Sequence, residues 1–197
     1  MKLDVVFSGV GGQGVVVLSD IFCEAALASG YDVAKAEVHG MAQRGGSIIA
    51  HARIGDNVQA PLIERGRADV LLGFEMLETA RTIHMLKQGG TVVLNAKYLP
   101  PNLSYLVDAE PLNYSKILCM IKRNTGRVHE IDAVNMAEKL GNLLVVNTIL
   151  LGALSALPEN PIDRKMFEEA ISKRFKEKYI KVNLQAFEFG RKAVTLG

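Results

Sequence analysis

The feature that most restricts how this chain can fold is a cluster of glycines near its start, in residues 8–22 (SGVGGQGVVVLSDIF). The cluster follows an apolar, β-branched run at residues 3–7, which is typical of a short buried strand, and it leads into a segment of helical length. Gly9, Gly11 and Gly14 have the G-x-G-x-x-G spacing found in phosphate-binding turns between a strand and a helix. The stretch therefore predicts a strand, turn and helix whose turn faces a ligand or a partner.

Each glycine has its own predicted role. Gly9 allows the tight turn, Gly11 lets the backbone approach a phosphate, and Gly14 lets the helix pack closely against the strand. The helix that begins beyond Gln13 would direct free N–H groups and a partial positive charge toward an anion. Glycine turns also occur where nothing binds, so the preceding strand and the following helix are what favour a binding surface.

Length and charge exclude several classes of protein. The 197 residues fit one domain, 1–197, and a formal net charge of +2 without a basic stripe argues against a nucleic-acid partner. The first residues lack the pattern of a signal peptide. The most apolar later run, residues 143–157, is shorter than the roughly 20 residues of a membrane span. We expect a cytoplasmic protein with no membrane contact.

The cysteines and histidines predict no metal site. Cys23 and Cys119 are the two cysteines, and neither belongs to a C-x-x-C pair, which excludes a cysteine-ligated iron–sulfur cluster or structural zinc within this chain alone. The four histidines are scattered without the spacing of metal ligands. No G-x-S-x-G elbow is present either, so no residue is assigned a catalytic role.

A second strand is predicted at residues 31–38, with Glu37 near its end. Glu37 lies about 20 residues beyond the glycines, where a dinucleotide-binding fold has the acid that holds ribose hydroxyls. A solvated carboxylate at a strand end explains Glu37 equally well. Both interpretations stay open at the level of sequence.

A second glycine-containing stretch, residues 38–47 (VHGMAQRGGS), is the other segment with a functional pattern. Its candidate binding residues are Gln43, Arg44, Gly45, Gly46 and Ser47. The guanidinium of Arg44 suits a phosphate or carboxylate, and the two glycines can present backbone N–H groups to the same anion. Alternatively, Arg44 pairs with a local carboxylate and the glycines only form a hairpin.

The remaining pattern predicts an α/β fold. Strands are expected at residues 47–54, 69–74, 91–95 and 128–131, and helices at residues 75–87, 113–123, 133–140, 143–157, 163–175 and 177–194. Residues 31–54 leave no room for a crossover helix, so these two strands should be antiparallel or distant. We expect a Rossmann-like, three-layer α/β/α fold with a mixed, mostly parallel sheet and C-terminal helices. Its ligand crevice would lie at the carboxyl ends of the strands, beside the first glycine cluster and Glu75.

Two later segments suggest contacts. Residues 96–115 form a connection interrupted by prolines. A connection of this length in a compact domain usually has a function, which indicates a lid or a subunit contact. The helix at residues 143–157 is apolar almost all round, hence interior or interfacial. Asn147 within it needs a hydrogen-bond partner if it is buried, and a ligand contact is the alternative. The stripe Ile180, Leu184, Phe187 and Val194 is interpreted as core packing.

Three motifs in order resemble a known family. The motifs are residues 9–14 (GVGGQG), 37–46 (EVHGMAQRGG) and 147–154 (NTILLGAL), and the chain resembles the gamma subunit, or gamma domain, of 2-oxoacid:ferredoxin oxidoreductases from Leu3 to about Gly190. The pyruvate and oxoglutarate branches of that family tend to carry a tyrosine, a proline and an acidic residue before the arginine and two glycines. This chain has VHGMAQ at residues 38–43 and is therefore most similar to the indolepyruvate branch, to the chain called the beta subunit there.

The resemblance implies a coenzyme A-dependent oxidative decarboxylation that gives acyl-CoA, CO2 and reduced ferredoxin, with indolepyruvate or another aryl pyruvate as the 2-oxoacid. Thiamine diphosphate and 4Fe–4S clusters would belong to a larger partner subunit, and this chain, inactive alone, would complete the active-site cleft of a hetero-oligomer. The residues expected to bind or cover the coenzyme A phosphates are Gly9, Gly11, Gly12, Gln13, Gly14, Gln43, Arg44, Gly45, Gly46, Ser47 and Asn147.

Two alternatives from other classes stay open. One is a free-standing nicotinamide- or flavin-dependent oxidoreductase, which the same glycine turn and Glu37 favour. The other is a non-catalytic scaffold in which the apolar helix at residues 143–157 and the connection around Pro100 only hold a partner.

Overall fold

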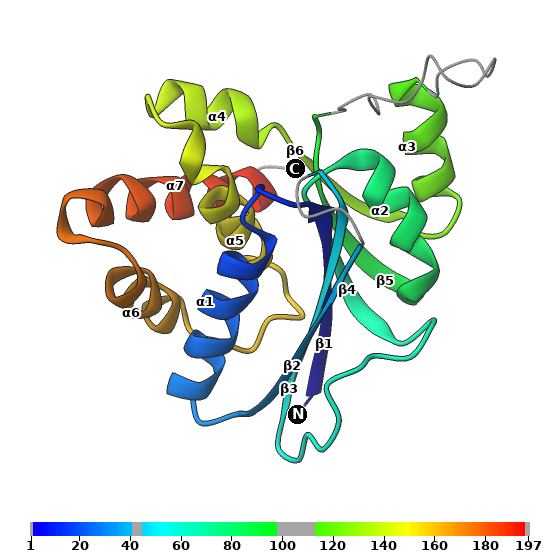
Figure 1. The fold of residues 1–197 in the computed structure, drawn as a ribbon, viewed down its shortest axis with the longest axis horizontal. Helices are drawn as coiled ribbons and strands as arrows, with labels where there is room; N and C mark the ends of the chain where they lie inside the picture. The colour runs from blue at the N-terminus through cyan, green and yellow to red at the C-terminus, as the bar shows by residue number, and fades with distance from the viewer. Residues whose placement is uncertain (1, 41–44, 98–112, 196–197) are drawn as a thin grey trace.

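The computed structural model describes residues 2–40, 45–97 and 113–195. Their strands form a six-stranded sheet in the order β2-β3-β1-β4-β5-β6, with helices on both faces (Figure 1). The strands are β1 (Lys2–Val10), β2 (Asp32–His39), β3 (Ser47–Gly55), β4 (Ala68–Gly73), β5 (Leu86–Asn95) and β6 (Arg127–Ile131). The helices are α1 (Val15–Ala28), α2 (Met76–Thr82), α3 (Tyr114–Lys122), α4 (Ala133–Lys139), α5 (Val146–Ser155), α6 (Arg164–Arg174) and α7 (Glu177–Thr195), with short 3-10 turns η1 (Ile83–Met85) and η2 (Leu143–Val145).

The sheet is mixed, as predicted. β1, β4, β5 and β6 are parallel neighbours, while β3 is antiparallel to both β1 and β2. β3 follows β2 without a crossover helix, so it enters the sheet between β2 and β1. The predicted three-layer α/β/α architecture with C-terminal helices is confirmed.

Two apolar cores lie on opposite faces of the sheet. In Figure 1, α1 and the C-terminal helices cover one face, and α2 and α3 cover the other. The larger core contains a chain of ring contacts in which Phe22 packs against Phe7 at 5.8 Å and against Phe167 at 6.3 Å, and Phe167 packs against Phe187 at 5.7 Å between centroids. These rings join β1, α1, α6 and α7, so the first helix and the last two are held to the same strand.

The apolar helix predicted at residues 143–157 forms η2 and α5. α5 is interior, as expected, whereas Leu143 and Leu144 on η2 are exposed. It crosses α7 at two glycines. A Cβ on Gly152 would lie 2.0 Å from the Phe187 carbonyl oxygen, and one on Gly190 would lie 1.8 Å from the Ile149 carbonyl oxygen. The two backbones are therefore in direct contact, which only glycine allows.

The prediction of a helix at residues 75–87 was wrong at the carboxyl end of that segment. α2 stops at Thr82, η1 follows, and Gly89 and Gly90 lie inside β5 rather than after a helix. The cause is Leu86, whose buried side chain and pairing with Ala68 commit this segment to the sheet. Tertiary pairing thus overrides the helical pattern of the segment.

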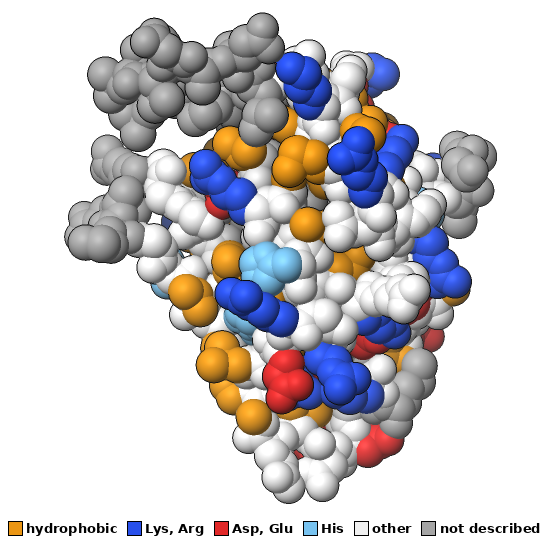
Figure 2. All heavy atoms as spheres, turned by 90° about the vertical axis from the view of Figure 1, so that its right-hand side faces the viewer, with side chains coloured by type: hydrophobic (Ala, Val, Ile, Leu, Met, Phe, Trp, Pro, Cys, Tyr) orange, Lys and Arg blue, Asp and Glu red, His pale blue; other side chains and the backbone are white. Residues whose placement is uncertain are grey.

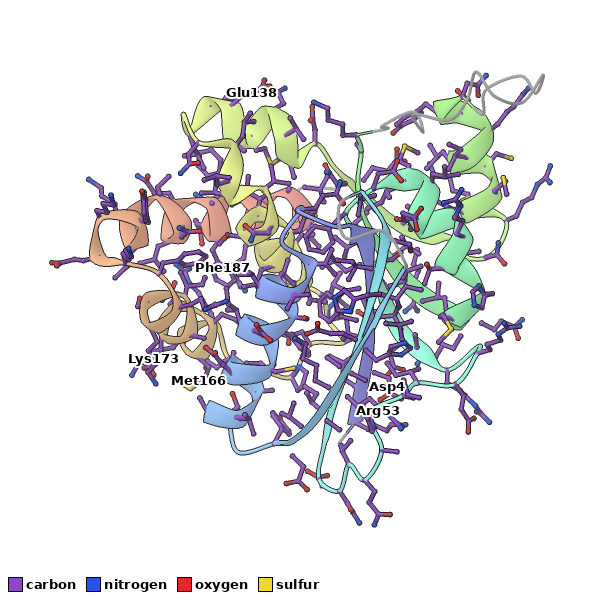
Figure 3. All side chains as sticks on the ribbon, in the orientation of Figure 1. Asp4, Arg53, Glu138, Met166, Lys173 and Phe187 are labelled. Carbon is purple, nitrogen blue, oxygen red and sulfur yellow. The ribbon has the colours of Figure 1, made fainter. Side chains whose placement is uncertain are left out.

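A buried ion pair lies at the amino edge of the sheet, opposite the edge where β1 ends. Asp4 is 1% exposed, and its carboxylate accepts hydrogen bonds from Arg53 Nε at 3.0 Å and Nη2 at 3.4 Å. Arg53 also donates to the carbonyl oxygen of Ala60 at 3.0 Å. Figure 3 labels Asp4 and Arg53 side by side at the lower end of the strands. The pair ties β1, β3 and the following loop together.

The surface on the α2 and α3 side is mixed in character. Figure 2 shows Lys and Arg side chains spread among apolar and polar ones there, without a continuous basic stripe on this face. Among the helices that the structure describes, none combines the length and the apolarity that crossing a membrane requires.

Candidate functional site

The first glycine cluster forms a turn between β1 and α1. Its left-handed residues are Gly12, with φ 99°, and Gly14, with φ 84°. Gln13 closes the turn, because its Oε1 accepts a hydrogen bond from Val10 N–H at 2.8 Å and its own N–H donates to the Val10 carbonyl at 3.1 Å. The strand, turn and helix predicted from the sequence are therefore present, and the Gln13 side chain stabilises the turn.

The roles of Gly9 and Gly14 differ from the predicted ones. Gly9 lies within β1 and outside the left-handed region, and a Cβ there would lie 2.8 Å from Phe74 Cβ and 2.9 Å from Val15 Cγ2. Gly9 therefore permits close packing and is not a turn residue. A Cβ on Gly14 would lie 2.7 Å from Asn147 Nδ2, so Gly14 makes room for α5 rather than for the strand. Spacing alone could not reveal either neighbour.

The amino end of α1 is electrostatically open. Gly14 is the N-cap residue, no side chain caps the helix, and its first turn carries no acidic residue. The first N–H groups and the positive end of the helix dipole are thus not neutralised by α1 itself. The helix start predicted beyond Gln13 is therefore present, and the binding of an anion there stays a prediction.

A cavity of about 400 Å³ opens beside this turn, at the carboxyl edge of the sheet. Residues 12–14, Phe74 at the end of β4, Asn95 at the end of β5, and Lys97 line one side of it. The other side is mainly apolar and is lined by Val134, Leu143, Leu144, Val146 and Asn147. Among the described lining residues Lys97 is the charged one and none is acidic, so the cavity suits an anion.

Asn95 contributes a buried, unsatisfied acceptor to this cavity. Asn95 is only 4% exposed, and its Nδ2 donates a hydrogen bond to the Phe74 carbonyl at 3.1 Å. Asn95 Oδ1 is buried and has no hydrogen-bond partner among the residues that the structure describes. A buried acceptor left without a donor is costly and requires an explanation.

Asn147 is buried, and the structural hydrogen bond predicted for it is present. It is 8% exposed, and its Oδ1 accepts a hydrogen bond from Thr148 N–H at 2.8 Å. Thr148 Oγ1 is in turn bound to Asn183 Oδ1 at 2.7 Å, which connects this residue to α7. The Nδ2 of Asn147 faces Gly14, at the cavity wall, so the ligand contact considered as the alternative is compatible with the same geometry.

The second glycine stretch reaches the first one. Gly11 N–H donates to the Gly46 carbonyl at 2.9 Å, and Gly40 N–H donates to the Ser47 carbonyl at 2.8 Å. Gly45 adopts a left-handed φ of 73°. Gly45, Gly46 and Ser47 therefore lie at the end of the β2–β3 hairpin, next to the turn but outside the cavity lining. The other two predicted residues of this stretch, Gln43 and Arg44, lie outside the described residues, as does most of the connection around Pro100.

Glu37 does not occupy the position of a ribose-binding acid. It lies on β2, which β3 separates from β1, and its carboxylate pairs with Lys35 at 2.7 Å and with His39 Nε2 at 3.6 Å. Glu75 does lie at the carboxyl edge, as predicted. There it caps α2 by accepting a hydrogen bond from Glu78 N–H at 3.0 Å. Neither carboxylate lines the cavity.

The described residues contain no cluster of three or more His, Cys, Asp or Glu side chains that could hold a metal ion. Burial raises the pKa of the Cys23 thiol to about 12, which leaves it protonated and unreactive at neutral pH. The described residues that line the cavity include no Ser, Thr, Cys, His, Asp or Glu side chain.

Sequence reasoning missed Phe74, Asn95 and Lys97. All three follow or end strands β4 and β5, whose positions were predicted, and the carboxyl ends of parallel strands meet at one sheet edge. By that rule, the end of the strand predicted at residues 91–95 places Asn95 at the same edge as the first glycine cluster and Glu75.

Comparisons with known proteins agree with this fold. The profile described as pyruvate ferredoxin/flavodoxin oxidoreductase matches residues 4–193. The chain is 38% identical over 193 residues to indolepyruvate oxidoreductase subunit IorB of Thermococcus kodakarensis, covering 98% of this chain and 96% of the relative.

Two solved structures have the same fold. The gamma subunit of a keto/oxoacid ferredoxin oxidoreductase from Geobacter sulfurreducens is 25% identical, with a TM-score of 0.74 and coverage of 99% of both chains. A 2-oxoglutarate:ferredoxin oxidoreductase from Magnetococcus marinus is 22% identical with a TM-score of 0.77, and the match covers 100% of this chain but 31% of that longer one. At that identity the second match shows a shared fold and no more.

Proposed function

The chain belongs to the pyruvate ferredoxin/flavodoxin oxidoreductase family and is a subunit of a 2-oxoacid:ferredoxin oxidoreductase, and we propose that its cavity binds coenzyme A in the assembled enzyme. Enzymes of this family generally use coenzyme A, thiamine diphosphate and iron–sulfur clusters.

The observation that carries the proposal is the charge of the cavity beside the glycine turn. The uncapped amino end of α1 and the ammonium group of Lys97 border it, and no described lining residue is acidic. Phosphate groups are bound in this way at helix amino ends, by backbone N–H groups together with a cation. Coenzyme A carries such phosphates, and residues 12–14 and Lys97 are the groups proposed to hold them.

We further propose that the redox cofactors belong to a larger partner subunit. A 4Fe–4S cluster is held by four cysteine thiolates, and this chain has two cysteines, one of them buried. Thiamine diphosphate supplies the carbanion chemistry of decarboxylation when it is bound, and the clusters carry electrons to ferredoxin. The exposed leucines at the cavity support a contact with that partner, since Leu143 is 57% and Leu144 85% exposed.

The proposed 2-oxoacid is indolepyruvate or a related aryl pyruvate. Support comes from the 38% identity to an indolepyruvate oxidoreductase subunit over nearly the full length of both chains. The VHGMAQ sequence at residues 38–43, in place of the pattern of the pyruvate and oxoglutarate branches, agrees with it. The assembled complex should reduce ferredoxin faster with indolepyruvate than with pyruvate or 2-oxoglutarate at equal concentrations. The reverse order would refute this substrate assignment.

Lys97→Ala in the co-purified complex tests the coenzyme A site. Loss of the ammonium group should raise KM for coenzyme A by about five- to tenfold and leave KM for the 2-oxoacid unchanged, because a charge-assisted contact to phosphate is lost. The matched control is Lys173→Ala, a lysine on the outer side of α6 (Figure 3). An unchanged KM for coenzyme A in Lys97→Ala would contradict the proposal.

A scaffold without a binding role is tested in the same assay. The larger subunit alone should form acyl-CoA poorly, and adding this chain should restore the rate. Full coenzyme A-dependent activity of the larger subunit by itself would favour the scaffold alternative.

A further inference from the structure

We infer that two copies of this chain pair through the free edges of their β2 strands, antiparallel to each other and about a two-fold axis at Ala36. The inference concerns the lateral edge of the sheet, outside the cavity lining, and it does not depend on the coenzyme A site. β2 is the first strand in the order of the sheet. β3 pairs with one of its sides, and in the part of the chain that the structure describes no strand pairs with the other.

The free edge of β2 is long and regular. The strand spans Asp32–His39, contains no proline, and keeps one register against β3 without a bulge. Gly40 N–H donates to the Ser47 carbonyl at 2.8 Å, and hydrogen-bonded pairs alternate along an antiparallel ladder. The main-chain groups of the even-numbered residues therefore point toward β3, and those of the odd-numbered residues 33–39 point away from it. Such an edge is a template for another strand.

The two faces of β2 differ in character. Val33 packs against the larger core and Lys35 pairs with Asp20 of α1, so the odd-numbered side chains lie on the α1 side. Val38 lies on the other side and is 49% exposed. The even-numbered side chains on that side are all apolar: Ala34, Ala36 and Val38. A strand added at this edge would extend the apolar row and cover part of it.

The charges on the α1 side identify a second copy as the partner strand. When residue 36 of one copy lies opposite residue 36 of the other, Lys35 of each copy lies opposite Glu37 of the other, and the outward-pointing main-chain groups meet. Lys35 already contacts Glu37 within one copy, with Nζ and Oε1 2.7 Å apart. The four charges of the two copies therefore alternate in sign, which stabilises cross-strand pairs.

The same charges fix the register. Moving the axis by one residue, to position 35 or 37, keeps the main-chain groups matched but places Lys35 opposite Lys35, or Glu37 opposite Glu37. Like charges directly opposite each other are destabilising. With the axis at Ala36, the apolar face is also matched, because Ala34 lies opposite Val38 of the second copy.

Antiparallel pairing leaves room for both candidate sites. β2 runs parallel to β1, because β3 is antiparallel to both of these strands. The β1 strands of the two copies therefore run in opposite directions, and the two cavities lie at opposite ends of the joined sheet. Each copy can then contact its own larger subunit.

Sedimentation velocity of the full chain over a range of concentrations tests the pairing. The wild type should form a dimer whose population rises with concentration. Lys35→Glu and Glu37→Lys should each raise the dissociation constant of the dimer by at least about tenfold, because the two-fold axis turns one substitution into two like-charge contacts. Lys87→Glu is the matched control, since Lys87 also lies on a strand and pairs with an aspartate, Asp69. This variant should dimerise like the wild type.

An equimolar mixture of the Lys35→Glu and Glu37→Lys chains should dimerise again. One chain carries glutamate at both positions and the other carries lysine at both, so opposite charges meet only in the mixed dimer. Recovery of the dimer also reports that both variants are folded. A wild type that stays monomeric at about 100 μM, where weak contacts are populated, overturns the inference. Single variants that dimerise as well as the wild type overturn it too.

A cysteine at the axis tests the register without changing a charge. The background is Cys119→Ser, which removes the exposed native thiol. With oxidised glutathione as the oxidant, Ala36→Cys should form a disulfide between two copies, because directly opposed Cα atoms lie about 4.5 Å apart at such a position. Ala34→Cys is the control. Its two copies would lie four residues apart along the strands, about 13 Å or more, which is too far for a disulfide.

The cross-linking is carried out on the full chain and on the co-purified complex. A disulfide at position 36 in both supports the inferred contact. Its absence, or a disulfide at position 34 instead, overturns the register. If the full chain stays monomeric and Lys35→Glu weakens binding of the larger subunit, β2 pairs with that subunit and the inference is wrong. KM for coenzyme A enters none of these results, so failure here leaves the proposed function standing.

Discussion

Gly14 connects the local backbone of the turn to the buried asparagine of α5. Gly14 and Gly30 share the same left-handed φ of 84°, but a Cβ on Gly14 would lie 2.7 Å from Asn147 Nδ2, whereas nothing lies within 4 Å of one on Gly30. Substituting alanine at each of the two positions therefore separates the effect of backbone strain from that of steric contact. They form a matched pair for mutation.

Gly14→Ala should destabilise the protein more than Gly30→Ala. Both substitutions incur the strain of a left-handed alanine, about 1–2 kcal/mol, and Gly14→Ala additionally displaces Asn147. Urea unfolding of the two variants measures the difference, and KM for coenzyme A should rise in Gly14→Ala alone. Equal losses of stability in the two variants would show that the Asn147 contact is unimportant.

His51 makes stability depend on pH. Its residue is 6% exposed, its Nδ1 accepts a hydrogen bond from Ile63 N–H at 3.3 Å, and burial lowers its pKa below the ordinary value of 6.5. The unfolded chain therefore takes up a proton near pH 6.5, and the folded chain does so only at lower pH. The contribution of His51 is full above about pH 7.5 and is lost progressively as the pH falls through 6.5, the ordinary pKa.

We expect the free energy of unfolding to fall between about pH 7.5 and 5.5, and to fall less in His51→Gln. Glutamine stays neutral and can still accept the hydrogen bond from Ile63. Urea titrations at several pH values measure the slope, with the exposed His84→Gln as the control that should keep the wild-type slope. Identical slopes for His51→Gln and wild type would rule out this explanation.

At the level of single residues, the sequence predicted part of the candidate site. The glycine spacing pointed to the turn that contains Gln13 and Gly14, and the apolar helix and the family resemblance pointed to Asn147; all three residues line the cavity. The sequence could not show that Gly14 contacts Asn147, because 132 intervening residues separate positions 14 and 147 in the sequence. Asn95 belongs to no motif, and although its place at a strand end was predictable, the lack of a partner for its Oδ1 among the described residues is visible only in the structure.

Among the elements, the crossing of α5 and α7 is the most restrictive contact. Gly152→Ala should cost about 3 kcal/mol or more, because the new methyl group would overlap the Phe187 carbonyl, 2.0 Å away, and the two helices must move apart. Gly126→Ala is the control, since nothing lies within 4 Å of its Cβ position. Thermal unfolding of both variants tests this, and comparable melting temperatures would contradict close backbone contact.

Most elements could be predicted from periodicity, and the one clear error has a physical cause. The alternating pattern of β3 and the apolar length of α5 gave the right type and place. At residues 83–90 the helical spacing continued into a segment that the structure pairs with β4. Long-range strand pairing decides such boundaries, and a local pattern does not contain it.

For the whole molecule, the exposed leucines at the cavity predict where the larger subunit docks. Leu144 is 85% exposed and lies on η2 at the cavity wall. Leu144→Asp should weaken assembly with the larger subunit at least about tenfold without lowering the melting temperature of the isolated chain, because a charge would be desolvated at the contact. Leu27→Asp, at a leucine 59% exposed on α1, is the matched control. Size-exclusion chromatography of mixed subunits measures assembly, and equal assembly by both variants would place the contact elsewhere.

The insertion of β3 between β1 and β2 limits what this scaffold could be engineered to bind. In a dinucleotide-binding fold the acid on the second strand reaches the ribose because that strand is the immediate neighbour of the first. Here an antiparallel strand occupies that place. Replacing residues near Glu37 would therefore not create a nicotinamide-dependent enzyme, since the obstacle is the order of the strands and no point mutation reorders a sheet.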